Sequence, residues 1–258
     1  MDLGLTGRVA VVTGASRGLG KAIAKSLAQE GCDLTICARG TDALEEAAAE
    51  LRSLGATVQA IALDLTDQGE PERLIAAAAE EHGGLDVVVN NVGGNRRGTV
   101  EESTDEDWDD IIRLNFMTHL GCARAAVPHL RRRAGGSITF VSSIFGREAG
   151  GPGLAIYNST KSALISLAKI MALELAPAGI RVNSIAPGSI QFPGGSWDKR
   201  VKADPEGMKV FIEENLPLGR FGRAEEIGDV VAFLASDRAS LITGACLNVD
   251  GCQSRSLI

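Results

Sequence analysis

The 258-residue sequence predicts an α/β fold, in which one doubly wound domain holds a seven-stranded parallel sheet flanked by helices. Short runs rich in valine and isoleucine alternate with longer segments of helical periodicity, which is the pattern of repeated β-α-β units. A glycine-rich turn follows the first run directly, and no linker rich in proline or serine interrupts the alternation. Length alone would also allow two small domains, but the unbroken pattern favours a single domain over residues 1–258.

The seven apolar runs are the expected strands. They cover residues 8–13, 33–38, 57–63, 86–90, 137–142, 181–186 and 245–249. Thr104 and Asp107 have the spacing of a capping box, so we expect a helix that begins just before Trp108 and runs through Asn115 toward Pro128. The segment 188–223 is too long for a simple connection, and we predict a substrate lid with short helical pieces there.

Composition excludes several classes of partner. The net charge of −7 repels polyphosphate, and we interpret the basic run at 131–133 as cations at a helix C-terminus, so no nucleic-acid partner is expected. No stretch approaches the roughly 20 apolar residues of a membrane span, and the N-terminus lacks the regions of a signal peptide. We therefore expect no membrane partner and a cytoplasmic location.

Neither the cysteines nor the histidines form a recognisable ligand pattern. The five cysteines, an odd number without C-x-x-C spacing, suggest no disulfide framework and no zinc site, and we expect them to be buried or half-buried. The three histidines are far apart in the sequence and lack partners at ligand spacing. No metal is expected.

The turn after the first strand, residues 13–20, reads Thr-Gly-Ala-Ser-Arg-Gly-Leu-Gly and leads into a helix that begins near Leu19. Glycines allow a tight turn and a close approach to a pyrophosphate, whose charge the backbone N–H groups and the helix N-terminus can meet. The placement between a strand and a helix predicts a dinucleotide site.

The end of the second strand indicates which dinucleotide is bound. An acidic side chain there would accept a hydrogen bond from the ribose 2′-hydroxyl of NAD, but this sequence has Ala38 followed by Arg39. Arg17 lies within the glycine turn. Two guanidinium groups without a carboxylate suit the 2′-phosphate of NADP.

Acid/base chemistry is predicted by Tyr157 and Lys161, which share one face at the start of a long helical pattern. An ammonium beside a phenol favours the phenolate, so we expect Lys161 to lower the pKa of Tyr157 from its usual value near 10. Ser142 and Ser143 end the fifth strand at the same sheet edge, where a hydroxyl can donate to a substrate carbonyl.

Over essentially the whole chain these residues resemble the short-chain dehydrogenase/reductase family, whose fold is a Rossmann domain. Residues 13–20 fit its T-G-x-x-x-G-x-G, residues 90–93 are similar to its N-N-A-G, and Tyr157 with Lys161 fits its Y-x-x-x-K. Residues 187–188 and 247–251 resemble its P-G turn and its closing strand.

The resemblance implies a catalytic tetrad of Asn115, Ser143, Tyr157 and Lys161. Ser143 is preferred to Ser142 because the family serine is usually followed by two residues and a glycine, with Ser142 as the fallback. Tyr157 would be the acid/base, Lys161 would bind the nicotinamide ribose, and Asn115 would hold a water molecule of the proton relay. The residues expected to bind the cofactor are Gly14, Ser16, Arg17, Gly18, Leu19, Gly20, Arg39, Asp64, Leu65, Asn91, Gly93, Tyr157, Lys161, Pro187, Gly188 and Ile190.

Three departures from the family pattern affect the cofactor and substrate walls. Val92 replaces the usual alanine. Phe192 stands where many members have a threonine that reaches the nicotinamide carboxamide, so Ser189 is an alternative for that contact. The loop between Ser143 and Tyr157, with glycines at 150, 151 and 153, is a residue longer than in many relatives.

The expected function is an NADP(H)-dependent oxidoreductase that interconverts a ketone and a secondary alcohol, with a small-molecule substrate. The leading interpretation is a carbonyl reductase of a small or medium apolar ketone, among which the resemblance to fatty-acid reductases includes a 3-oxoacyl thioester, and a sterol, polyol or sugar alcohol dehydrogenase using NADP or NAD is the alternative. A non-catalytic dinucleotide-sensing protein is the alternative from another class. Relatives bury two long helices, here 105–133 and 156–177, between subunits, so a homotetramer is expected.

Overall fold

The computed structural model describes residues 2–257 and contains a seven-stranded parallel sheet in the order β3-β2-β1-β4-β5-β6-β9. Its strands are β1 (Val9–Thr13), β2 (Asp33–Ala38), β3 (Val58–Ala62), β4 (Val87–Asn90), β5 (Gly136–Val141), β6 (Ile180–Pro187) and β9 (Cys246–Val249). The predicted seven-stranded Rossmann fold is confirmed, and every predicted strand end lies within one residue of the observed one. The strand order reverses between β1 and β4, and the crevice at such a point is where open α/β sheets bind ligands.

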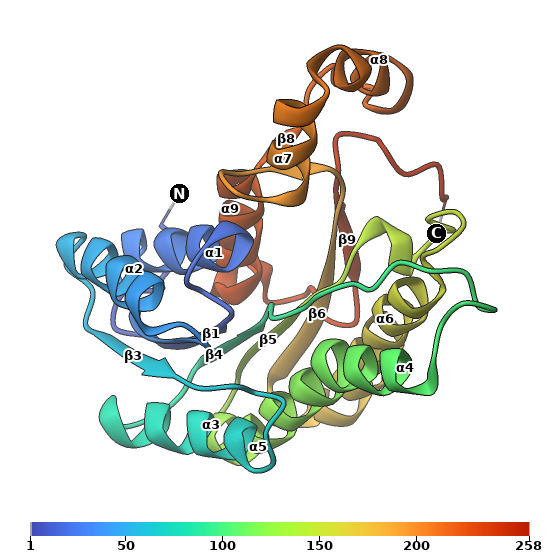
Figure 1. Cartoon of the computed structure of the whole chain (residues 1–258). Coiled ribbons are helices and arrows are strands. Elements are labelled where there is room, and N and C mark those ends of the chain that lie inside the picture. The colour runs from blue at the N-terminus through green and yellow to red at the C-terminus, as the bar shows by residue number, and fades with distance from the viewer. Residues whose placement is uncertain (1, 258) are drawn as a thin grey trace.

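Helices cover both faces of the sheet (Figure 1). One face carries α1 (Gly18–Gln29), α2 (Thr41–Ser53) and α9 (Ala224–Ala235), and the other carries α3 (Glu70–Glu81), α5 (Thr118–Arg132) and α6 (Ala155–Leu175). The remaining helices are α4 (Asp105–Ile112), α7 (Ser196–Ala203), α8 (Pro205–Asn215) and the short 3₁₀ turns η2 (Ile144–Gly146), η3 (Ala176–Ala178) and η4 (Asp237–Ala239).

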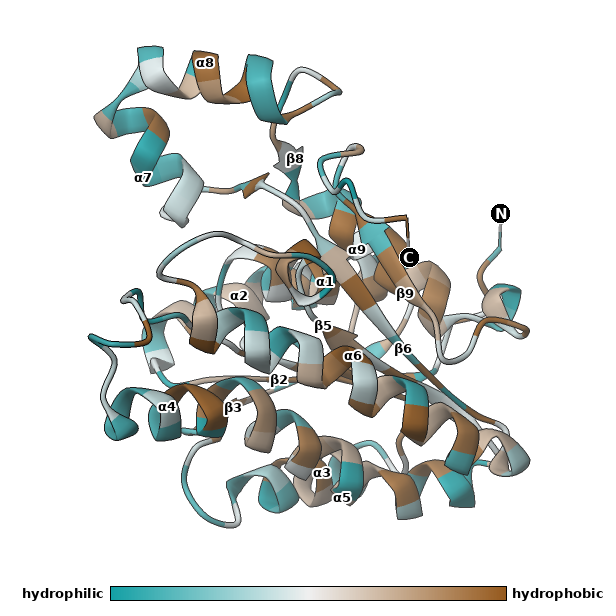
Figure 2. Cartoon of the chain, turned by 90° about the vertical axis from the view of Figure 1, so that its right-hand side faces the viewer, coloured by the Kyte–Doolittle hydropathy of each residue, from teal (hydrophilic) through white to brown (hydrophobic). Residues whose placement is uncertain are grey.

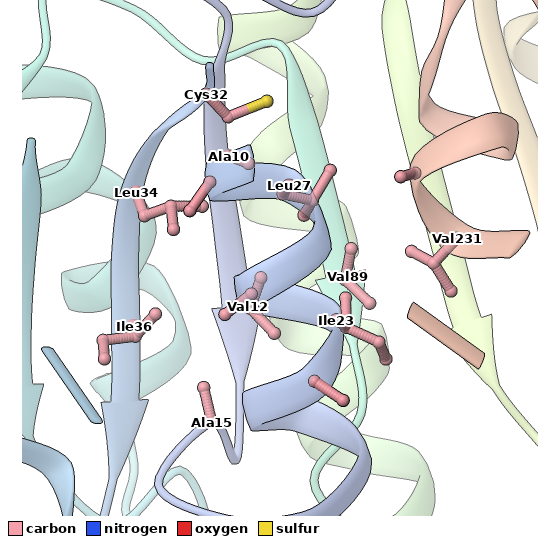
Figure 3. Close-up of a cluster of buried hydrophobic side chains, with 14 of the residues drawn as sticks. Ala10, Val12, Ala15, Ile23, Leu27, Cys32, Leu34, Ile36, Val89 and Val231 are labelled. Atoms are coloured by element: carbon pink, nitrogen blue, oxygen red, sulfur yellow. The ribbon is translucent and has the colours of Figure 1, made fainter. Parts of the chain in front are cut away.

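The core between α1 and the sheet consists of aliphatic side chains that alternate along the strands. Val12 and Ile36 point from β1 and β2 toward Ile23 and Leu27 of α1, and all four are fully buried (Figure 3). Full burial of one such side chain contributes roughly 1.5–3 kcal/mol. This packing fixes α1 against β1 and thereby fixes the turn that joins them.

The predicted capping box at the start of α4 is confirmed. The Thr104 hydroxyl accepts a hydrogen bond from the Asp107 N–H at 3.2 Å, and the Asp107 carboxylate accepts from the Thr104 N–H at 3.1 Å. The helix does not stay α-helical to its end, because a π-helical turn, η1 (Arg113–Met117), joins α4 to α5. Such turns are frequent at functional sites, and this one contains Asn115.

The segment 188–223 contains the expected short helices. The short strands β7 (Ile190–Gln191) and β8 (Gly222–Arg223) pair in parallel at its two ends, and α7 and α8 project beyond the carboxyl edge of the sheet between them (Figures 1 and 2). The Trp197 ring lies 4.8 Å from Phe211 and 5.2 Å from Phe221, measured between centroids. This aromatic cluster packs α7 against α8 and against the chain that returns to β8.

The cysteines follow the sequence expectation with one exception. Cys32, Cys37 and Cys122 are buried and Cys246 is half-buried, but Cys252 is exposed, so the prediction was wrong there. Cys252 lies in a left-handed turn after β9, with a φ of +67°, rather than on a sheet or helix face. Among residues 2–257 no helix combines the length and the apolar character needed to cross a bilayer.

His119 is a fully buried histidine beneath the sheet edge. Its Nε2 lies 2.6 Å from the Val92 carbonyl, so Nε2 carries the proton, and its buried Nδ1 has no partner among the described residues. The ring stacks on Phe140 at 6.1 Å. Burial, reinforced by the charge of Lys161, lowers the pKa of His119 to about 3.

This depressed pKa predicts a loss of stability in mild acid. The unfolded chain binds a proton at the usual histidine pKa near 6.5, whereas the folded chain does so only near 3, so stability falls as the pH drops below 6.5. The free energy of unfolding is expected to decrease between pH 7 and pH 5 in the wild type, and this decrease should exceed that of His119→Gln by about 2 kcal/mol. Urea unfolding of both proteins at several pH values measures this, and a difference that stays constant with pH would refute it.

Candidate active site

The turn between β1 and α1 approaches the loop after β4 so closely that two of its residues must be glycine. Gly14 has a φ of +65°, and a side chain at Gly20 would overlap the Gly14 carbonyl and lie 2.5 Å from Nδ2 of Asn91. That Nδ2 donates hydrogen bonds to the carbonyls of Thr13 and Gly14 at 2.9 and 3.2 Å. The N-cap Arg17 makes no side-chain cap, which leaves the first N–H groups of α1 available to an anion.

A cavity of about 920 Å³ extends from this turn across the carboxyl ends of the strands. It is lined by every predicted site residue except Asn115, namely Gly14, Ser16, Arg17, Gly18, Leu19, Gly20, Arg39, Asp64, Leu65, Asn91, Gly93, Ser143, Tyr157, Lys161, Pro187, Gly188 and Ile190. The structure thus brings together segments that follow six different strands. Its volume suits a dinucleotide with a small substrate.

At the end of the cavity beside the glycine turn and the end of β2, cations outnumber carboxylates. Arg17 and Arg39 both line the wall, and the Arg39 side chain is 76% exposed, with only a 3.8 Å contact to Asp64. Burial raises the pKa of Asp64, but hydrogen bonds from Thr66 and the charge of Arg39 outweigh it and leave that pKa below its usual range. Of the first two acids on α2, Glu45 pairs with Arg52 at 3.4 Å, and neither Asp42 nor Glu45 lines the cavity.

At the opposite end, Lys161 is a buried cation. Its side chain projects from α6, its Nζ donates to the Val141 carbonyl at 2.8 Å, and the residue is only 4% exposed. Burial lowers the pKa of Lys161 to about 8. The ammonium of Lys161 is therefore sensitive to any negative charge placed near it.

Tyr157 does not have the lowered pKa that the sequence predicted. Burial raises the pKa of Tyr157, and its hydrogen bond with Ser143 only partly offsets this. The Lys161 ammonium lies 5.8 Å from the centroid of the phenol ring and donates to Val141. In the chain alone, Tyr157 therefore keeps its proton at neutral pH.

The two serines after β5 have different surroundings. The Ser142 hydroxyl donates to the Lys161 carbonyl at 2.8 Å, which ties β5 to α6. The Ser143 hydroxyl accepts from the Phe145 N–H at 3.2 Å and bonds with Tyr157. Ser142 is thus engaged with the backbone, and Ser143 is the serine paired with the phenol.

Asn115 lies behind the cavity wall. Its Oδ1 accepts from the Gly94 N–H at 2.8 Å, and its Nδ2 donates to the Gly94 carbonyl at 2.9 Å and to Thr160 at 3.1 Å. A Cβ on Gly93 would lie 3.2 Å from Asn115 Oδ1 and 3.5 Å from Lys161 Nζ. These contacts join η1 to the loop after β4 and to α6.

Some of the lining residues were not named as site residues from the sequence. Phe192 packs against Gly18, where a Cβ would lie 2.7 Å from its ring, and Trp197 and Lys199 reach the cavity from α7. Ser196 and Lys199 are three residues apart, and that helical spacing was the available signal. The signal was weak because nothing in the sequence says which face of a short helix points inward.

The sequence and the fold match known proteins over nearly their whole lengths. Residues 14–252 match the family model described as "Enoyl-(Acyl carrier protein) reductase". The 3-oxoacyl-(acyl-carrier-protein) reductase FabG of Thermotoga maritima is 34% identical over 247 residues, which cover 96% of this chain and 98% of that protein. The human "Dehydrogenase/reductase SDR family member 4" is 37% identical over 248 residues, 96% of this chain and 87% of that protein.

A solved structure also matches this chain over its whole length. The L-sorbose reductase of Gluconobacter frateurii, complexed with NADPH and L-sorbose, superposes with a TM-score of 0.94. That protein is 36% identical in sequence, and the match covers 100% of both chains.

Proposed function

Because the chain belongs to the short-chain dehydrogenase/reductase family, we propose that it interconverts a ketone and a secondary alcohol with NADP(H). One observation carries this proposal: Ser143, Tyr157 and Lys161 share a cavity with a glycine turn and two arginines. The hydrogen-bond donors along the cavity fit NADP(H). Uncapped N–H groups of α1 suit the pyrophosphate, and Arg17 and Arg39 suit the 2′-phosphate.

The reacting groups lie at the other end of the cavity. NADPH, when bound, would supply a hydride to the carbonyl carbon, and NADP+ would accept one from the alcohol carbon in the reverse direction. Tyr157, protonated at neutral pH, gives its proton to the carbonyl oxygen, and the Ser143 hydroxyl donates a hydrogen bond to the same oxygen. Lys161 would hold the nicotinamide ribose and would stabilise the phenolate that results. The family resemblance assigns a water molecule of the proton relay to Asn115, and here that water would bind the backbone of Asn115, because both ends of its amide are bonded to Gly94 and Thr160.

The substrate class we favour is a 3-oxoacyl thioester. Leu114 and Trp197 add apolar side chains to the cavity lining that suit an acyl chain, and relatives such as the Thermotoga protein carry that name. Residues 188–223 act as the lid over this wall, within a single domain that spans 1–258. A sugar or polyol is the second candidate, because the L-sorbose reductase superposes so closely.

The homotetramer and the cytoplasmic location remain predictions. Exposed apolar side chains on the helices that relatives bury between subunits support the tetramer, including Ile112 and Met117 near η1 and Ile170 and Leu173 on α6.

Light scattering is expected to give four times the chain mass of 26.9 kDa, and a monomer at micromolar concentration would refute the assembly.

Turnover is predicted to depend on Tyr157. Tyr157→Phe should reduce NADPH consumption with acetoacetyl-CoA to below about 1% of wild type, because the proton donor is lost while the ring remains. NADPH binding, followed by its fluorescence, should change little. Retained activity would exclude Tyr157 as the acid.

The same assay separates the candidate functions when wild type is given acetoacetyl-CoA, L-sorbose and crotonyl-CoA. Preference for the first supports the thioester ketone, and preference for the second supports the sugar. Reduction of crotonyl-CoA alone would indicate enoyl chemistry, as in the description of the family model. NADPH binding without turnover of any carbonyl would indicate a dinucleotide sensor.

Cofactor choice is predicted to depend on Arg39. A charge-assisted contact to the 2′-phosphate contributes about 1.5 kcal/mol or more, less the screening at this exposed position, which implies a preference for NADPH over NADH of roughly tenfold. Arg39→Ala should remove most of that preference in kcat/KM, whereas Arg52→Ala, on the far end of α2, should not. Equal use of both cofactors by wild type would contradict the assignment.

A further inference from the structure

The C-terminal segment 250–256 contacts two loops that are far from it in sequence. One is the loop after β6, which lines the cavity, and the other is the loop between Ser143 and Tyr157, whose two flanking residues line it. β9 ends in a tight turn where Gly251 and Cys252 both have left-handed φ values, of +62° and +67°. The Asp250 carboxylate closes this turn by accepting hydrogen bonds from the N–H groups of Cys252 and Ser254, at 3.0 and 2.8 Å. The chain then returns across the sheet edge toward the loop before α6 (Figure 1).

Gln253 binds the loop after β6 from both ends of its amide. Its Oε1 accepts from the Ser189 N–H at 2.7 Å, and its Nε2 donates to the Ser189 hydroxyl at 2.9 Å. Ser189 lies between Gly188 and Ile190, which line the cavity. Packing is equally close at Gly188, where a Cβ would lie 2.7 Å from Gln253 Oε1.

Glu148 binds the other end of the segment. Its Oε2 accepts hydrogen bonds from the Ser254 hydroxyl at 3.0 Å and from the N–H groups of Arg255 and Ser256 at 3.0 and 3.1 Å. The half-buried Glu148 belongs to the loop between Ser143 and Tyr157.

The backbone of Glu148 is tied to the catalytic residues on both sides. Its N–H donates to the carbonyl of Ile144, the residue after Ser143, at 3.1 Å. Its carbonyl accepts from the side chain of Asn158, the residue after Tyr157, at 2.8 Å. A displacement of Glu148 would therefore reach both Ser143 and Tyr157.

We propose that segment 250–256 is a strap that fixes the position of the loop after β6 relative to the loop before α6. Gln253 and Glu148 are its positioning residues. Neither of them lines the cavity, so both act through Ser189 and through the loop of Ser143. The loop after β6 would contact the cofactor, and the loop before α6 joins Ser143 to Tyr157. The strap therefore sets the distance between the cofactor and the groups that react with the substrate. Reaction rates are sensitive to such distances at the scale of an ångström. This inference rests on the proposed function.

Gln253→Ala is the first test. Loss of both bonds to Ser189 should weaken NADPH binding by about tenfold while binding of adenosine 2′,5′-bisphosphate, which lacks the nicotinamide half, stays unchanged. Gln253→Glu should restore binding, because a carboxylate can accept from both the Ser189 N–H and its hydroxyl. Arg255→Ala is the matched control, since only the backbone of Arg255 contacts Glu148.

A double-mutant cycle on kcat/KM for acetoacetyl-CoA reduction tests the strap itself. Gln253→Ala and Glu148→Ala should each lower kcat/KM by about tenfold, and the double variant should lose little more, because a strap released at one end no longer acts at the other. Additive losses of about a hundredfold would show two independent supports and overturn the proposal. A lower melting temperature with unchanged kcat/KM and NADPH affinity would overturn it as well. A wild type that binds no NADPH would instead overturn the proposed function.

Discussion

The whole site depends on the close approach between the turn after β1 and the loop after β4. Asn91 occupies the space that the missing side chain of Gly20 leaves, and its amide holds the carbonyls of Thr13 and Gly14. The Thr13 hydroxyl in turn accepts hydrogen bonds from the N–H groups of Asn91 and Val92. Since β1 and β4 are the strands between which the sheet order reverses, this contact opens the crevice and aims α1 into it.

The same contact leads inward to the catalytic end. The Val92 carbonyl accepts from buried His119, and the next two residues lie against Asn115 and Lys161. His119 is thus a structural histidine, although the sequence alone gave it no partner. One continuous set of hydrogen bonds and packed atoms therefore joins the glycine turn to Lys161.

Much of this could be predicted from the sequence because it depends on local pattern. The seven strands follow from valine and isoleucine runs, and the Thr104–Asp107 box marks the start of α4. The topology then brings the ends of separate strands to one edge, which is why the predicted residues line one cavity. The π turn at Asn115, the inward face of α7 and the contacts of Gln253 depend instead on tertiary packing, for which single-residue periodicity carries no signal.

The pKa of Tyr157 shows why spacing was not enough to predict its chemistry. A spacing of four positions from tyrosine to lysine puts both side chains on one face, but burial acts on each group separately and favours its neutral form. Burial therefore raises the pKa of Tyr157 and lowers the pKa of Lys161. In the chain alone, neither charged form is stabilised by an opposite charge on the other group.

This arrangement explains how one pair can both hold and release a proton. In the reaction proposed here Tyr157 gives its proton to a substrate oxygen, and the phenolate that results would lie near the Lys161 ammonium, so that each charge would compensate the burial of the other. Nζ lies 5.8 Å from the centroid of the phenol ring. If this distance, about 6 Å, is taken as the charge separation, opposite unit charges at an effective dielectric constant of about 20 attract by about 3 kcal/mol, equivalent to roughly two pKa units. The attraction exists only after the proton has moved, so it stabilises the transferred state and leaves the resting phenol protonated.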